Sequence, residues 1–324
     1  SRAGNYLPFD YSYNILQSTE KDAIIFTNGD NDTFPLWYLQ DVAGVRRDVR
    51  IVNLSLANTL WYVDQLKNRS PWGAEKLPLS FADDSIQVSE TDPGALSYDF
   101  GVAFNVAIPV DREILKQYTD DPAVLADGHM RFQYKATPYG QRDGQQFYLY
   151  QVRDKVILDI LKQVRFERPI YYSRTVGPDV YNNLDQFFRT EGMANRVCPV
   201  PQNTGIGGSL EPDIMEKCIM NVDNSDNYSK TPKYGFKFRN LGTPGVYYDE
   251  VHRRLMRSYR QLYLEYAQYV FYDLKDSSKA IEIMDVMNKQ ISPVQFPFSY
   301  DIEYKVSLMY EQAGDREKAE KYAY

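Results

Sequence analysis

One strand–helix–strand unit near the N-terminus restricts the fold more than any other part of this sequence. Ala23–Thr27 (AIIFT) is a short apolar run that predicts a buried strand, and Val49–Leu56 (VRIVNLSL) predicts a second one. Thr33–Asp41 lies between them and predicts a helix. Because a right-handed crossover through one helix returns the chain in the same direction, we expect the two strands to be parallel. The unit therefore predicts an α/β fold.

The start of this helix carries clear local signals. Asp32 or Thr33 can serve as its N-cap, and Pro35 would then fall in the first turn, where its missing N–H costs nothing. The turn before it, Asn28–Asp32, contains Gly29, which can supply a backbone conformation that other residues avoid. We therefore expect an acidic turn between the first strand and the helix.

Two further strands are predicted later in the chain. Pro169–Ser173 (PIYYS) is apolar, and Arg196–Val200 (RVCPV) contains a proline that favours an edge position. The segment between these two strands, Pro178–Phe188, predicts a helix from the spacing of its apolar residues. Residues 1–200 are thus predicted to form a Rossmann-like, mostly parallel sheet of four strands, with a β-rich insertion at about 71–150. In this insertion, Met130–Ala136 alternates between apolar and polar residues like a strand, and Asp143–Gly144 predicts a hairpin turn.

The remaining residues change character twice. Residues 201–247 predict an irregular linker, and its Gly205–Gly208 cluster is interpreted as a plain loop, since no basic phosphate partner follows it. Residues 248–324 predict helices throughout, and Ser278 can cap one of them. A similar turn precedes Ala280 and Ala319, which lie 39 residues apart. This spacing favours a tetratricopeptide-like helical tail.

Composition excludes several classes of protein. The 324 residues carry a net charge of −7, which disfavours a nucleic-acid partner. No apolar run is long enough to span a bilayer. Two histidines exclude a multi-histidine metal site, and Cys198 and Cys218 could be free thiols or one disulfide. The chain does not begin with Met and ends within a helical pattern, so we expect it to be a segment of a longer protein.

Polar side chains cluster where the predicted parallel strands end, which is where open α/β folds place ligands. Asp30 and Asp32, with Asn31 between them, could hold a divalent cation through oxygen ligands, and no other cofactor is predicted. The structural alternative is that Asp32 caps the helix and that Asp30 and Asn28 hold the turn through side-chain hydrogen bonds. Both interpretations remain open from the sequence.

Three more residues complete the predicted ligand-binding set. Asn53 and Ser55 lie near the end of the second strand, and Arg174 follows the third. Together with Asn28, Asp30, Asn31 and Asp32 they could bind a polar ligand such as a sugar. The alternative for Arg174 is an ion pair with an aspartate of the turn. No catalytic residue can be assigned from the sequence.

These residues resemble one family. The pattern comprises Thr27–Gln40 (TNGDNDTFPLWYLQ), Asp48–Leu56 and Trp61–Tyr62, with weaker support from Val156–Leu161, Arg168–Tyr172, Leu184–Gly192, and Tyr248–Glu250 with Arg253 and Met256. It is similar to the soluble C-terminal region of large bacterial multi-pass membrane proteins of unknown function that are described as protein O-mannosyltransferase-like. The resemblance covers most of the chain and is most specific at residues 27–62.

The resemblance implies a location and a limited role. In that family the glycosyltransferase-like chemistry is assigned to a membrane-embedded part of the same polypeptide, which is absent here. We therefore expect a non-catalytic, extracytoplasmic accessory domain on the periplasmic side of the bacterial inner membrane, which recognises an acceptor protein or a glycan. One alternative is a metal-dependent sugar-binding or glycosyltransferase site at Asp30–Asp32. A second is a structural scaffold for assembly of the membrane part.

Overall fold

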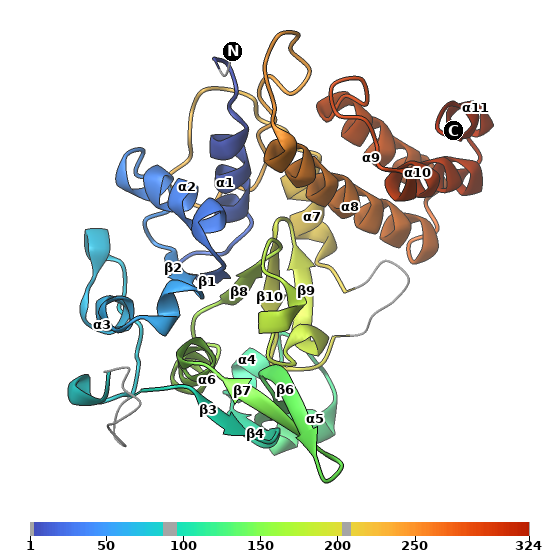
Figure 1. Ribbon diagram of the computed structural model, residues 1–324. Helices are drawn as coiled ribbons and strands as arrows, with labels where there is room; N and C mark the ends of the chain where they lie inside the picture. The colour runs from blue at the N-terminus through green and yellow to red at the C-terminus, as the bar shows by residue number, and fades with distance from the viewer. Residues whose placement is uncertain (1–2, 87–95, 203–208, 324) are drawn as a thin grey trace.

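A five-stranded mixed sheet lies at the centre of the molecule (Figure 1). The computed structural model describes residues 3–86, 96–202 and 209–323, so the glycine cluster Gly205–Gly208 lies outside the described residues. The sheet has the order β2-β1-β8-β10-β9. Its strands are β1 (Ile24–Thr27), β2 (Arg50–Asn53), β8 (Ile170–Ser173), β9 (Phe188–Glu191) and β10 (Ala194–Val197).

Three of these strands are parallel, as the βαβ pattern predicts. β1 pairs in parallel with β2 on one side, with Ile25 opposite Ile51, and with β8 on the other side. β10, by contrast, runs antiparallel to β8 and to β9. The predicted edge position of the fourth strand is therefore wrong, because β10 is paired on both sides and Pro199 lies beyond its end. The sheet is mixed, with β2 and β9 at its edges.

The predicted helix over Pro178–Phe188 is also wrong. This segment forms two short 3₁₀ helices, Pro178–Val180 and Asp185–Phe187, and Phe188 already begins strand β9. Asn182 and Asn183 adopt positive φ angles of 54° and 66°, which interrupt any continuous helix. The apolar spacing reflects burial of Val180, Leu184 and Phe187 in a non-helical segment.

Helices cover both faces of the sheet, and alternate strand residues point to opposite faces. Ile25, Ile51 and Tyr171 pack in one core with the helices α1 (Leu7–Gln17), α2 (Asp30–Asp41) and α8 (Glu250–Tyr272). Ile24, Phe26 and Tyr172 pack in a second core. That core contains the helices α3 (Leu60–Asn68) and α6 (Val152–Val164), with the 3₁₀ helix Leu56–Asn58 alongside.

The described residues between α3 and α6 form the β-rich insertion. Its strands make a three-stranded sheet, β3-β7-β6, and a two-stranded sheet, β4-β5. Met130, Phe132 and Tyr134 point inward from β5, as the alternating sequence predicts. The predicted hairpin at Asp143–Gly144 joins β6 to β7. The elements are β3 (Asp99–Gly101), β4 (Phe104–Pro109), α4 (Arg112–Leu115), α5 (Pro122–Asp127), β5 (His129–Tyr134), β6 (Thr137–Arg142) and β7 (Gln145–Tyr150).

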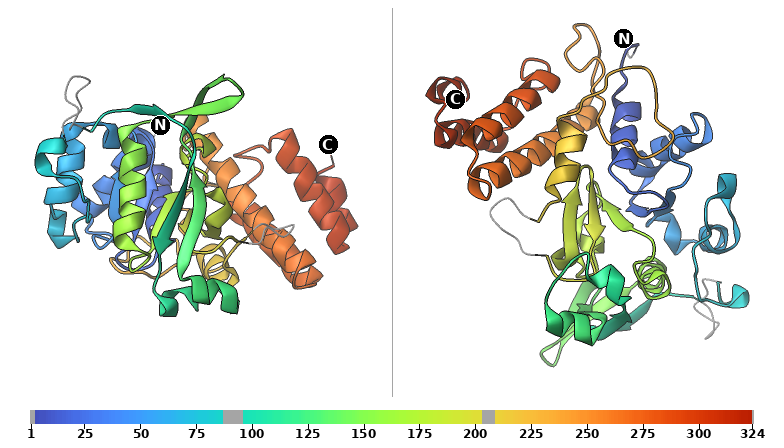
Figure 2. Two further views of the ribbon diagram at one scale, coloured as in Figure 1. Left: turned by 90° about the horizontal axis from the view of Figure 1, so that it is seen from below. Right: turned by 180° about the vertical axis from the view of Figure 1, so that it is seen from behind.

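The C-terminal region is helical and lies on a different side of the sheet from the insertion (Figure 2). It contains α8 followed by α9 (Ser277–Gln290), α10 (Tyr300–Ala313) and α11 (Arg316–Lys321). Asp276 caps α9 by accepting a hydrogen bond from the Lys279 amide, so the predicted cap at Ser278 is wrong. No helix among the described residues is long and apolar enough to cross a membrane.

The segment between the sheet and α8 is mostly irregular but firmly anchored. Its described residues contain one helix, α7 (Pro212–Ile219), and Phe236 and Phe238 are buried in the same core as α1 and α8. The Asn14 side chain on α1 accepts from the Lys237 amide at 2.8 Å and donates to the Lys237 carbonyl at 2.9 Å. This segment therefore packs across α1.

Candidate functional site

The carboxyl ends of the three parallel strands meet at one edge of the sheet, as the parallel pairing requires. Thr27 ends β1, Asn53 ends β2 and Ser173 ends β8. The Thr27 hydroxyl lies 2.8 Å from the hydroxyl of Thr33, which donates to the Gly29 carbonyl, also at 2.8 Å. The strand ends and the first turn of α2 are therefore held together by side-chain hydrogen bonds.

Asn53 is a structural residue of this edge. It is fully buried, and its Nδ2 donates to the Gly29 carbonyl at 3.3 Å and to Thr33 Oγ1 at 3.0 Å. Its Oδ1 accepts from the amides of Ser55 and Leu56, at 2.9 and 3.1 Å. Because both ends of the amide group already make two hydrogen bonds, Asn53 positions the turn and has little capacity left for a ligand.

The helix α2 begins earlier than predicted. Its first residue is Asp30 and its N-cap is Gly29, which has φ 80° and ψ 177°, so the predicted caps Asp32 and Thr33 are wrong. Pro35 lies inside the helix and not in its first turn. Gly29 sets this start, because its dihedral angles fall in a region that is essentially restricted to glycine. Asp30 and Asp32 therefore occupy the first helical turn, where negative charge is favourable.

Asn28, Asp32 and Ser55 are brought together by this arrangement. Ser55 Oγ donates to Asn28 Oδ1 at 2.8 Å, and the Asn28 amide donates to Asp32 Oδ2 at 3.4 Å. The Thr175 hydroxyl, which follows β8, also donates to Asp32 Oδ2. Burial raises the pKa of Asp32, and the hydrogen bonds from Thr175 and Asn28 oppose this shift.

Arg174 does not pair with an aspartate of the turn. Its Nη2 donates to Glu265 Oε1 of α8 at 2.9 Å, and its Nη1 contacts Thr190 Oγ1 at 3.4 Å. The Arg174–Glu265 ion pair therefore links the end of β8 to the C-terminal helical region. Its partner lies 91 residues away in the sequence.

A pocket of about 270 Å³ opens beside these strand ends, between α1, α2 and α8. Asp30, Asn31 and Asp32 form its polar side. The other lining side chains come from α1 (Pro8, Tyr11, Ser12, Ile15), from α2 (Phe34, Pro35) and from α8 (Val251, His252, Leu255). Of the seven predicted ligand-binding residues, Asp30, Asn31 and Asp32 line this pocket.

Tyr11 is a notable member of the pocket lining. It is 4% exposed, and its hydroxyl makes no well-formed hydrogen bond among the described residues. Burial is the main cause that raises its pKa; Ser258 and Arg174 oppose the shift, and the Asp32 carboxylate adds to it. A buried hydroxyl beside a carboxylate offers a donor and an acceptor to a polar ligand.

The α8 side of the pocket is fixed by local capping. Asp249 Oδ1 accepts from the His252 amide at 3.0 Å, and Arg254 pairs with Glu250 within the same helix at 2.6 Å. Sequence patterns could not place α8 at this pocket, because it begins at Glu250, far from Asp30 along the chain.

The pocket combines one polar side with largely apolar walls. Two carboxylates and an amide provide hydrogen-bond acceptors and donors, and the walls on α1 and α8 are largely apolar. Across residues 3–86, 96–202 and 209–323, no group of three or more His, Cys, Asp or Glu side chains is arranged to hold a metal. A cation here would therefore need further oxygen ligands beyond Asp30 and Asp32.

Comparisons with known proteins give one match. The sequence matches the family described as TMEM260-associated domain 2 over residues 8–121 and 105–214, which together cover more than half of the chain. No curated protein and no solved structure gives a significant match. The matched region contains the whole five-stranded sheet and the strand-end residues described above.

Proposed function

The chain belongs to the family described as TMEM260-associated domain 2, and we propose on this premise that it is a non-catalytic accessory domain of a membrane protein, which recognises a glycan. The observation that carries this proposal is the pocket beside Asp30, Asn31 and Asp32. Its volume of about 270 Å³ is close to the lower limit of ordinary ligand pockets, and matches a ligand of about one sugar ring. Carboxylate and amide side chains can bind the hydroxyl groups of such a ring.

We further propose that the membrane protein is glycosyltransferase-like, of the protein O-mannosyltransferase-like type, and that this domain lies on the periplasmic side of the membrane. Support comes from the resemblance of residues 27–62 to that group of proteins. In this proposal the membrane-embedded part carries out transfer, and the pocket binds part of the substrate or product.

We also propose an evolutionary origin for the central sheet and one for the C-terminal helices. The parallel β2-β1-β8 set with α2 as crossover supports a Rossmann-like origin of the sheet. Two features support a tetratricopeptide-like origin of the tail. Asp276 and Asp315 cap α9 and α11 in the same way, and Ala280 and Ala319 are both buried after those caps. Such helical pairs commonly bind protein segments, so an acceptor protein would contact this region.

Glycan-array binding of the purified protein tests the main proposal. The wild type is expected to bind a subset of the array, and a variant with Asp30→Ala and Asp32→Ala is expected to lose at least about tenfold in affinity while its circular dichroism spectrum stays unchanged. Arg254→Ala is a matched control, since its ion pair with Glu250 is exposed and Arg254 does not line the pocket. Loss of folded structure in the double variant would instead assign both aspartates to stabilisation of the first turn of α2.

A divalent cation at Asp30 and Asp32 is the second candidate, favoured by the presence of both carboxylates in one helical turn beside the pocket. Isothermal titration with Mn²⁺ and Ca²⁺ tests it. Saturable binding that is lost in Asp30→Asn would support the cation, and no binding at millimolar concentration would reject it. The glycan proposal does not depend on this result.

A further inference from the structure

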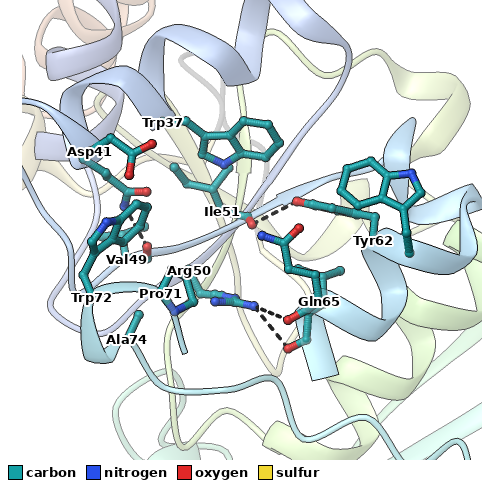
Figure 3. A pocket seen from close by; sticks show the side chains of 13 residues that line it. Trp37, Asp41, Val49, Arg50, Ile51, Tyr62, Gln65, Pro71, Trp72 and Ala74 are labelled. Atoms are coloured by element: carbon teal, nitrogen blue, oxygen red, sulfur yellow. Dashed lines mark hydrogen bonds between the residues drawn. The ribbon is translucent and has the colours of Figure 1, made fainter. Parts of the chain in front are cut away.

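All three tryptophans of the chain line one pocket, which is separate from the pocket at Asp30. The pocket has a volume of about 310 Å³ and lies at the edge strand β2, between α2, α3 and residues 71–74. Trp37 comes from α2, Trp61 from α3 and Trp72 from the loop after α3. Figure 3 shows Trp37, Tyr62 and Trp72 around Arg50.

Arg50 provides a buried positive charge in this pocket. Arg50 is 4% exposed, and its Nη2 donates to the carbonyls of Gln65 and Leu66 at 3.0 and 3.2 Å. These bonds cap the last turn of α3. Its Nε and Nη1, however, have no hydrogen-bond partner among the described residues. Burial lowers the pKa of this guanidinium; Tyr62 opposes the shift and the nearby Arg168 adds to it.

No carboxylate forms a salt bridge with Arg50 in the described part of the chain. A buried guanidinium with two unpaired nitrogens is unusual, because each unmet donor carries a desolvation cost. The helix cap accounts for Nη2 only. A carboxylate is the group that best complements the remaining donors, since arginine and carboxylate form short charge-assisted hydrogen bonds.

The surrounding charges also favour an anion. Asp41 lines the pocket, but Arg47 lies over the Trp72 ring at 5.7 Å and donates to the Asp41 carbonyl at 2.8 Å. Arg50 and Asp41 are thus the charged side chains of the lining, and Arg47 brings a second guanidinium next to the Trp72 wall. The excess positive charge attracts a negatively charged ligand.

Two of the three tryptophan walls, Trp37 and Trp61, are supported by contacts with neighbouring aromatic rings. Trp37 stacks on Phe34 with ring centroids 5.5 Å apart, and Trp61 meets Tyr62 edge-to-face at 5.4 Å. The Tyr62 hydroxyl in turn accepts from the Asn53 amide at 2.9 Å. Flat, fixed aromatic surfaces suit contact with a ring, because they offer a large contact area without loss of side-chain freedom on binding.

The backbone conformation of Trp72 is a further indication of a binding site. Its φ is 54° and its ψ is 18°, a left-handed conformation that bulky side chains rarely adopt. Its side chain is nevertheless 40% exposed, and that of Trp61 is 56% exposed. Strained residues of this kind concentrate at binding and active sites.

We propose that the pocket formed by Trp37, Trp61, Trp72 and Arg50 binds a small carboxylate whose six-membered ring lies against the tryptophan side chains. The carboxylate replaces the missing partner of Arg50, and side-chain movement of Trp72 or Gln65 at the wall opens the way to its buried nitrogens. The ring is that of an acidic sugar or of an apolar carboxylic acid, which share this chemistry. This inference is independent of the glycan pocket at Asp30.

Tryptophan fluorescence tests this inference directly, because every tryptophan of the chain lines the pocket. The probes are D-glucuronate and cyclohexanecarboxylate, each compared with its uncharged counterpart, D-glucose and cyclohexylmethanol. We expect a saturable change with at least one carboxylate and an affinity at least about tenfold lower for its uncharged counterpart. The carboxylate that binds more tightly identifies the type of ring.

Two variants assign the signal to the pocket. Trp72→Gly suits the left-handed backbone, so it should fold, and it should weaken binding by about tenfold or more. Arg50→Met should abolish the preference for the carboxylate over the uncharged probe, and a thermal melt shows whether the cap of α3 survives. Arg257→Met is the matched control, since that arginine pairs with Asp301 on the exposed side of the C-terminal helices.

The inference is overturned by any of three results. These are no saturable change with either carboxylate, equal affinity for the charged and uncharged probes, or unchanged affinity in Trp72→Gly. If Arg50→Met fails to fold, the titration of Trp72→Gly alone decides whether the carboxylate binds in this pocket.

Discussion

Asp10 and Arg239 form an ion pair across the interface between α1 and the segment before α8. Asp10 Oδ1 and Arg239 Nη2 lie 2.6 Å apart, and both side chains are almost completely buried. The Asp10 carboxylate also accepts from the Arg239 amide at 2.8 Å. Burial raises the pKa of Asp10, while the hydrogen bonds and the charge of Arg239 oppose that shift. This pair fixes the irregular segment onto the first helix.

Removal of one partner should therefore be costly. We predict that Arg239→Met lowers the free energy of unfolding by about 3–5 kcal/mol, because the Asp10 carboxylate would stay buried without its cation. Arg257→Met is the control, since its pair with Asp301 has side chains 61% and 45% exposed and should contribute at most about 1 kcal/mol. Urea denaturation measures both. Equal effects of the two substitutions would mean that the Asp10–Arg239 contact does not anchor the segment.

Gly29 is predicted to be irreplaceable on conformational grounds alone. A Cβ at this position would meet nothing within 4 Å, but φ 80° and ψ 177° lie in a glycine-only region. Gly29→Ala should thus destabilise the protein by about 1–3 kcal/mol. Gly242→Ala, also in open space but without a positive φ, should change stability by less than about 0.5 kcal/mol. A wild-type melting temperature for Gly29→Ala would argue against the capping role of Gly29.

Asp32 should make stability depend on pH in a defined direction. Its pKa in the folded state is raised above the ordinary aspartate value of 3.8, so its contribution to stability is present below that value and is lost as the pH rises through the folded-state pKa. Asp32→Asn should consequently be as stable as the wild type, or more so, at pH 7. The advantage of the variant should shrink when denaturation is repeated near pH 4. If the stability advantage of Asp32→Asn instead grew as the pH was lowered, the pKa of Asp32 would be lowered in the folded state and not raised.

The two cysteines should be unreactive in the native protein. Both are free and buried, which settles the alternative that the sequence left open. Burial raises the pKa of the Cys198 thiol to about 12 and also raises that of Cys218, so almost no thiolate exists at pH 8. Titration with a disulfide reagent such as 5,5′-dithiobis(2-nitrobenzoate) should give no fast reaction before unfolding and two thiols afterwards. Rapid reaction of either native thiol would contradict the burial described.

Local patterns predicted the elements whose signals lie within a few residues. The βαβ unit, the alternating β5 strand and the Asp143–Gly144 hairpin are all present, because apolar periodicity and turn residues determine them locally. The mistakes have a common cause. Helical spacing in Pro178–Phe188 and the proline after β10 could not reveal the neighbours that those residues would acquire in the folded chain.

In the candidate site, too, the sequence predicted what local patterns determine and missed what depends on contacts between distant residues. Asn28, Asp32, Asn53 and Ser55 come together because the parallel strands end at one edge, which the sequence predicts. The Arg174–Glu265 pair and the contribution of α8 to the pocket depend on contacts between distant parts of the chain. No spacing rule connects Trp37 to Trp72, so the second pocket was also beyond the reach of the sequence.

Comparison of glycan binding by the wild type and by the Asp30→Ala, Asp32→Ala double variant tests the central claim most directly. The account predicts that the wild type binds at least one glycan of the array and that the folded double variant binds it at least about tenfold more weakly. Equal binding by the folded double variant, or no binding by the wild type to any glycan, would contradict the account.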